Sequence, residues 1–167
     1  GGSSGGANYV PNSPGENERG NDAGIFGGDN DDGGDSVSTL NFKDLTINGG
    51  TALYGQAGVG GDLVHLTVTG NAALTGGSSN EVNNAEDVAN ATTAAYIVHD
   101  DEGYLDLHVI GNLTLTGGSG TSGIVVVGGL VETDLLLKVD GNLNVNLPNS
   151  QPIAGAVTIG AIGVNPL

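Results

Sequence analysis

The chain has 167 residues with 19 acidic and 3 basic side chains, a formal net charge of −16 and no cysteine. This balance argues against nucleic acid and anionic membranes as partners, because both are bound through Lys and Arg, and the missing cysteines exclude disulfides and thiol chemistry. No apolar run approaches the length needed for membrane insertion. The 37% hydrophobic content and 32 glycines favour one domain of thinly layered sheets.

Residues 1–36 form a Gly/Asp/Asn-rich N-terminal extension. Its few apolar side chains cannot bury enough surface to offset the chain entropy lost on folding. The chain begins at Gly1 rather than Met, and we interpret it as a secreted protein that has lost its signal peptide. We expect the extension to be a linker, or to be ordered by a metal or a neighbouring subunit.

An acidic run in this extension is the best candidate for a metal site. Closely spaced carboxylates with glycines between them let oxygen atoms converge on a hard cation such as Ca²⁺. The run departs from the EF-hand pattern at Gly33 and Leu40. Two interpretations stay open, a Ca²⁺ site and a solvated acidic linker. The candidate ligands are Asp29, Asp31, Asp32 and Asp35.

Residues 37–147 form a β-rich repeat domain in which alternating apolar residues surround a Gly-Asn pair. The pair occurs at 70–71, 111–112 and 141–142, and a weaker repeat with Leu45 and Ile47 has Gly-Gly at 49–50. Gly-Asn is typical of a two-residue hairpin turn. However, the apolar residues keep the same parity before and after each pair. The pattern therefore predicts a strand that runs on through a bend, at which Gly permits unusual dihedral angles.

The intervals between the repeats suggest stacked coils. Measured between the glycines they are 21, 41 and 30 residues. Twenty-one residues suit one coil of a β-solenoid, 41 suit two coils with a degenerate strand at 94–98, and 30 suit one coil with an insertion. We predict an all-β fold and favour a β-solenoid. The alternative is a β-sandwich or jelly roll with strand exchange.

The segments GNLTLTGGSG (111–120) and KVDGNLNVN (138–146) resemble the repeat regions of secreted bacterial adhesins, of autotransporter-passenger and filamentous-haemagglutinin type. The resemblance covers only the repeats themselves. It implies a secreted, right-handed β-helical shaft with a structural or adhesive role at the cell surface. The unequal intervals depart from the regular array of that family.

Catalytic and metal-binding patterns are weak elsewhere. His65, His99 and His108 lack the spacing of a zinc motif, and we expect His65 and His108 to face outward at different offsets. The carboxylates of 100–102 could act on glycosidic bonds. The chain has only four Tyr, two Phe and three basic residues to contact a sugar, so we expect that it is not an enzyme.

Two further features concern modification and assembly. Asn90 and Asn112 begin Asn-x-Thr tripeptides that match the glycosylation pattern. Residues 148–167 form an apolar tail that could complete a sheet in another subunit, or could be the last strand of its own domain. The assembly candidates are Ile153, Val157, Ile159, Ile162 and Val164.

These features together predict a secreted structural protein. We expect a self-assembling, β-rich subunit of an extracellular filament, appendage or matrix, with other molecules of the same chain as partners. Terminal strand exchange is one way of joining them. The alternative is a Ca²⁺-stabilised adhesin-type binding module that recognises a cell surface or a glycan.

Overall fold

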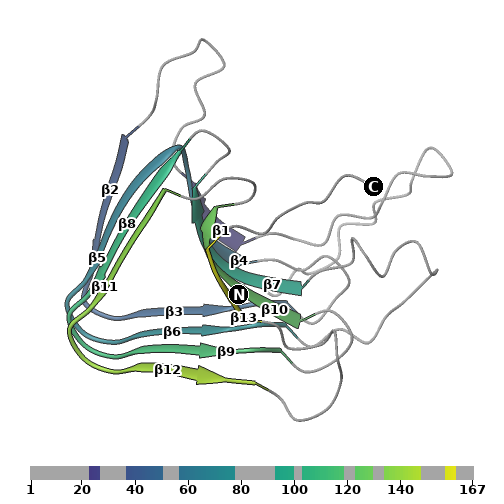
Figure 1. Cartoon of the computed structure of the whole chain (residues 1–167). Coiled ribbons are helices and arrows are strands. Elements are labelled where there is room, and N and C mark those ends of the chain that lie inside the picture. The colour runs from purple at the N-terminus through teal and green to yellow at the C-terminus, as the bar shows by residue number, and fades with distance from the viewer. Residues whose placement is uncertain are drawn as a thin grey trace, which may run out of the picture.

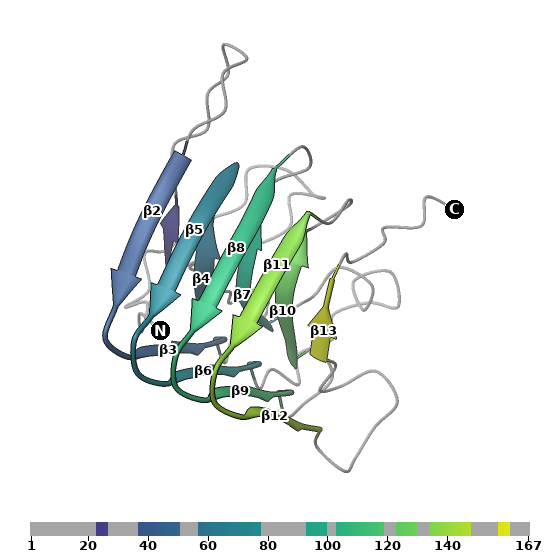
Figure 2. The same cartoon turned by 60° about the vertical axis from the view of Figure 1, so that its left-hand side comes forward.

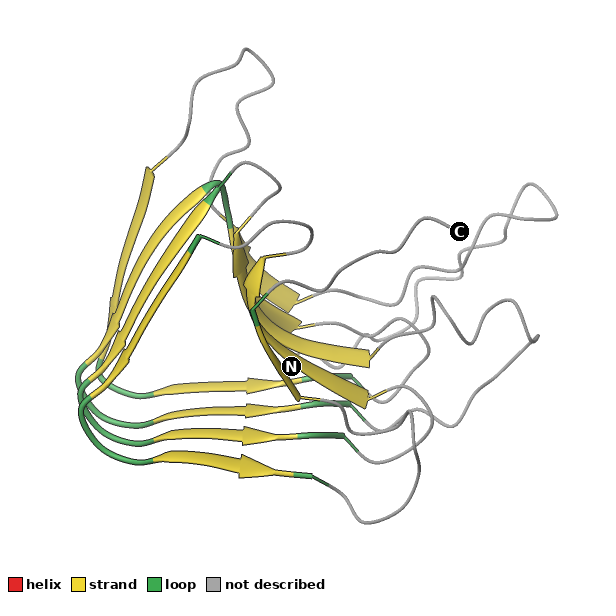
Figure 3. Ribbon diagram, in the orientation of Figure 1, coloured by secondary structure: helices red, strands yellow, loops and turns green. Residues whose placement is uncertain are grey.

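The structure is a computed structural model that describes residues 23–26, 37–50, 57–77, 93–99, 103–118, 123–129, 134–147 and 157–160. All the regular structure in these residues is β-strand (Figure 3). No helix that could cross a membrane occurs in this part of the chain.

The strands build three sheets, which the chain visits in turn (Figure 1). Sheet A contains β1 (Ala23–Phe26), β4 (Ala57–Gly60), β7 (Thr93–His99), β10 (Gly123–Gly129) and β13 (Val157–Ile159). Sheet B contains β2 (Val37–Phe42), β5 (Leu63–Val68), β8 (Tyr104–Val109) and β11 (Leu135–Val139). Sheet C contains β3 (Leu45–Asn48), β6 (Ala72–Thr75), β9 (Leu113–Thr116) and β12 (Leu143–Asn146).

Every pair of neighbouring strands is parallel and comes from successive turns of the chain (Figure 2). We call these turns coil 1 (β1–β3), coil 2 (β4–β6), coil 3 (β7–β9) and coil 4 (β10–β12), after which β13 adds one more strand to sheet A. Stacked coils of parallel strands make a β-solenoid. The preferred fold is confirmed, and the sandwich, which is built from antiparallel sheets, is excluded.

The core consists of aliphatic side chains that point inward, most of them from coils 2 and 3. Because the strands are in register, equivalent residues stack on one another, as Leu66 does on Leu107 and Leu74 on Leu115. These four side chains are fully buried. Burial of one such side chain contributes about 1.5–3 kcal/mol. The period-two apolar pattern therefore supplies the core of the solenoid.

The Gly-Asn pairs lie in the bend between sheets B and C. In coil 3, β8 ends at Val109 and β9 begins at Leu113, and both side chains point into the core. The pair at 111–112 lies between them. The prediction that Gly-Asn marks a bend in a continuing chain, rather than a hairpin, is confirmed.

The assignment of the first repeat was wrong. Leu45 is in register with Ala72, so Leu45 and Ile47 follow the bend instead of preceding it. The bend of coil 1 is made by Lys43 and Asp44, not by the glycines at 49–50. This bend is one residue shorter than the bends of the other coils. The inward-facing residues are therefore even-numbered before it and odd-numbered after it, so coil 1 does not show the repeat pattern of the other coils in its sequence.

The interpretation of the intervals must be corrected as well. The equivalent bend residues are Asp44, Asn71, Asn112 and Asn142, which are separated by 27, 41 and 30 residues. Each interval corresponds to one coil. The 41-residue interval does not hold two coils, because the strand predicted at 94–98 is β7, the sheet A strand of coil 3. The additional length lies between β6 and β7.

Both terminal segments contribute a strand to sheet A. Within residues 1–36, β1 pairs with β4. Within residues 148–167, β13 pairs with β10, with Val157 beside Val125 and Ile159 beside Val127.

Candidate functional site

A ladder of side-chain hydrogen bonds runs through the bends between sheets B and C. The backbone N–H of Asn71 donates to Oδ1 of Asp44, that of Asn112 donates to Oδ1 of Asn71, and that of Asn142 donates to Oδ1 of Asn112, each over 2.9 Å. The side chain of each bend therefore satisfies a backbone donor of the next coil. We call this row of four residues the corner ladder.

The glycine before each asparagine is required by close approach of the coils. A Cβ atom at Gly111 would collide with the backbone of Gly70, and one at Gly141 would collide with that of Gly111. Unusual dihedral angles, which the sequence predicted for these glycines, are not the reason, because the described glycines with positive φ are Gly61, Gly128 and Gly160. Glycine allows the bends to stack at the spacing of parallel strands.

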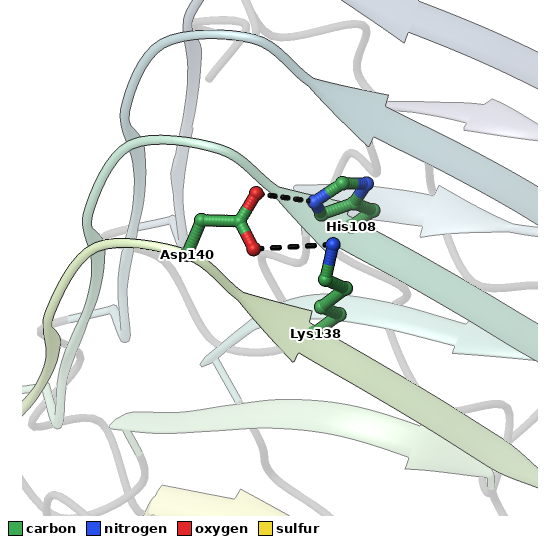
Figure 4. A network of polar contacts seen from close by, with 3 residues as sticks. All are labelled: His108, Lys138 and Asp140. Carbon is green, nitrogen blue, oxygen red and sulfur yellow. Dashed lines mark hydrogen bonds and ion pairs between the residues drawn. The ribbon is translucent and has the colours of Figure 1, made fainter.

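The outer face of sheet B carries the charged groups that link neighbouring coils. His108 Nε2 lies 2.9 Å from Asp140 Oδ2, and Lys138 Nζ lies 3.2 Å from Asp140 Oδ1 (Figure 4). A second pair joins His65 Nδ1 to Asp106 Oδ2 over 3.4 Å. The hydrogen bonds from His108 and then Lys138 lower the pKa of Asp140 below its ordinary value of 3.8.

The two histidine pairs connect neighbouring coils, whereas Lys138 and Asp140 both belong to coil 4. His65 lies beside Asp106 in the register, and His108 lies beside Thr67. The two histidines are therefore not register partners, as their different positions in the repeat predicted. His99 belongs to β7 in sheet A. The described residues contain no cluster of three or more His, Cys, Asp or Glu able to hold a metal ion.

The other candidates from the sequence fall in two groups. Outside the described residues are Asp29, Asp31, Asp32, Asp35, Asn90, the carboxylates of 100–102, Ile153, Ile162 and Val164. Inside them, Asn112 is part of the corner ladder, while Val157 and Ile159 lie in β13. The ladder was not predicted from the sequence, although Asn71, Asn112 and Asn142 follow a glycine at the same place in three repeats, which is the signal that identifies it.

The C-terminal coil differs from the inner coils because its apolar rows in sheets B and C are partly exposed. Leu143 and Val145 are in register with Leu113 and Leu115. The residues of coil 3 are fully buried, whereas Leu143 is 45% exposed and Val145 is 47% exposed. In the described strands, β11 and β12 each have a neighbour on one side only. Coil 4 therefore presents apolar side chains together with two sheet edges, a combination typical of an interaction surface.

Comparison of the chain with protein-family models, with curated proteins and with solved structures gives no match.

Proposed function

We propose that the protein is a secreted structural protein that self-assembles into an extracellular filament, appendage or matrix. The observation that carries the proposal is the open edge of sheets B and C at coil 4. There, Leu143 and Val145 leave exposed the apolar surface that their equivalents in coil 3 bury. Burial of that surface against another molecule would provide the driving force for association.

The composition of the described faces supports a structural role. The outer face of sheet C carries Thr114 and Thr116 in β9, and Asn144 and Asn146 at the same register positions in β12. These small, uncharged groups repeat from one coil to the next, as the strands of sheet C do in Figure 2. Such regular repetition suits a shaft.

Negative-stain electron microscopy of the purified protein tests the proposal. We expect elongated polymers that grow with protein concentration. A chelator arm tests whether the acidic residues 29–35 contribute through Ca²⁺, since loss of polymers on chelation and their return with added Ca²⁺ would require a bound cation. Monomers at every concentration, with and without Ca²⁺, would overturn the proposal.

Strand exchange through the tail is tested by deleting residues 153–167. The deletion removes the five assembly candidates, including Val157 and Ile159, which pair with β10 of their own chain. If the tail is the strand donor, the shortened protein should remain folded by circular dichroism and stay monomeric. Polymers of unchanged length would exclude the tail as donor and leave self-assembly through another surface.

A further inference from the structure

We propose that molecules stack head to tail, with β2 and β3 of one molecule continuing sheets B and C beyond coil 4 of another. In sheet A, β13 already pairs with β10, so β1 of the second molecule does not add to β10 in this arrangement. In this arrangement β2 of the second molecule adds to β11, and β3 adds to β12, both parallel and in the register that the coils already use. The inference rests on the proposed self-assembly and specifies its surface and partner.

The corner ladder gives the two ends complementary hydrogen-bonding groups. Within the ladder, each backbone N–H donates to the side chain of the preceding coil. Among the described residues, Oδ1 of Asn142 therefore receives no donor at one end, and the N–H of Asp44 has no acceptor at the other. Stacking would place the N–H of Asp44 of the second molecule against Asn142 Oδ1, as in every bend between coils.

In the same register, the inward-facing apolar residues of coil 4 lie opposite those of coil 1 of the second molecule. In sheet B, Leu137 and Val139 occupy the positions of Leu40 and Phe42 in coil 1, and all four are half-buried. Stacking would bury both pairs. In sheet C the surface is supplied mainly by coil 4, because Leu45 of coil 1 is already 9% exposed, against 45% for Leu143.

The charges at the two ends permit this contact despite the net charge of −16. Residues 37–50 contain one Lys and one Asp, and residues 134–147 contain one Lys and two Asp. Lys43 lies in the bend of coil 1 and Asp140 in the bend of coil 4, so stacking brings these opposite charges to the same corner. The repulsion between copies arises mostly from charges outside these two stretches, and salt screens it.

Head-to-tail contact has a consequence for the shape of the assembly. The two surfaces in contact are different, so the contact is heterologous, and a heterologous contact that does not close into a ring gives an open filament. Each added molecule presents a fresh coil 4. Growth therefore continues along the solenoid axis.

Engineered disulfides test the register in a chain that has no natural cysteine. Thr39 and Leu136 both face outward on sheet B and share one register row. In the stack their Cα atoms would lie about 4.8 Å apart, within the range that a disulfide spans. Mixed Thr39→Cys and Leu136→Cys proteins should therefore form a covalent dimer under mild oxidation, measured by non-reducing electrophoresis.

The matched control is a mixture of Asn41→Cys and Leu136→Cys proteins. Asn41 faces outward two residues further along β2, which places its Cα about 8 Å from residue 136, beyond disulfide reach. Only the in-register pair should cross-link. Equal yields from both mixtures, or disulfide dimers of the Leu136→Cys protein alone, would overturn the proposed stacking.

A charged substitution provides a second readout. Leu143→Glu places a charge on the stacking surface, whereas Ile110→Glu places one on the bend of coil 3, at 44% exposure against 45% for Leu143. We expect Leu143→Glu to abolish polymers and Ile110→Glu to leave their length unchanged. Polymers that form without the in-register cross-link and tolerate Leu143→Glu would exclude stacking while self-assembly stands. Monomers of the unmodified protein would overturn both proposals.

Discussion

Coils 3 and 4 have nearly the same sequence pattern but different surroundings. Leu113 and Leu143 are register partners at the same position after the Gly-Asn bend. The first is fully buried between coils 2 and 4, and the second is 45% exposed. The comparison shows that a repeat of this kind encodes which way a side chain points, while a neighbouring coil decides whether that side chain is buried.

The largest expected effect contrasts the two leucines directly. Leu113→Ala should lower the free energy of unfolding by about 2–5 kcal/mol, because it leaves a cavity in a packed core. Leu143→Ala, measured at concentrations where the protein is monomeric, should cost on the order of 1 kcal/mol, because its side chain is already half in water. Urea denaturation of the two variants measures both values. Equal losses would show that coil 4 is covered in solution.

The corner ladder gives a smaller contrast of the same kind. Asn112→Ala removes the acceptor of the Asn142 N–H, and an unsatisfied donor of this type costs about 1 kcal/mol. Asn142→Ala removes a side-chain oxygen that accepts from no described residue, so the monomer should keep its stability. Thermal unfolding of the two variants measures the difference. A loss for Asn142→Ala that appears only in polymers would support its role between molecules.

The smallest effect concerns the exposed pair on sheet B. The hydrogen bonds from His108 and Lys138 lower the pKa of Asp140 in the folded state. The contribution of this carboxylate to stability is therefore present above pH 3.8 and is lost as the pH falls through the lower, folded pKa. His108→Ala should move the Asp140 titration, followed by NMR, upward toward 3.8. His65→Ala, which alters the pair with Asp106, should leave the titration of Asp140 in place.

Much of the fold could be predicted from local patterns. Parity around residues 111–112 showed that the chain continues through a bend, because a hairpin would have sent Leu113 and Leu115 to the face opposite Leu107. The assignment failed at coil 1, where the shorter bend at Lys43 and Asp44 reverses the parity. It failed again at the 41-residue interval, because an insertion between two strands has no periodicity of its own and its length cannot be separated from that of an additional coil.

The candidate site was less predictable than the fold. The corner ladder depends on which bend lies above which, and the pairing of His108 with Asp140 depends on two residues 32 positions apart. No sequence motif fixes the number of residues between successive bends or between His108 and Asp140. Residues 29–35 and the tail candidates Ile153, Ile162 and Val164 lie outside the described residues, so the Ca²⁺ site and the strand donor stay predictions.

The sequence by itself determined the sheet B and sheet C strands of coils 2 to 4, their inward-facing residues and the bends between them, because alternation and a Gly-Asn pair act over a few neighbouring residues. Only the tertiary structure decided how many residues make a coil, which bends stack, and why glycine is needed there. Those properties depend on contacts between residues 27 to 41 positions apart. The same contacts leave β11 and β12 of coil 4 as the edges to which further strands can add.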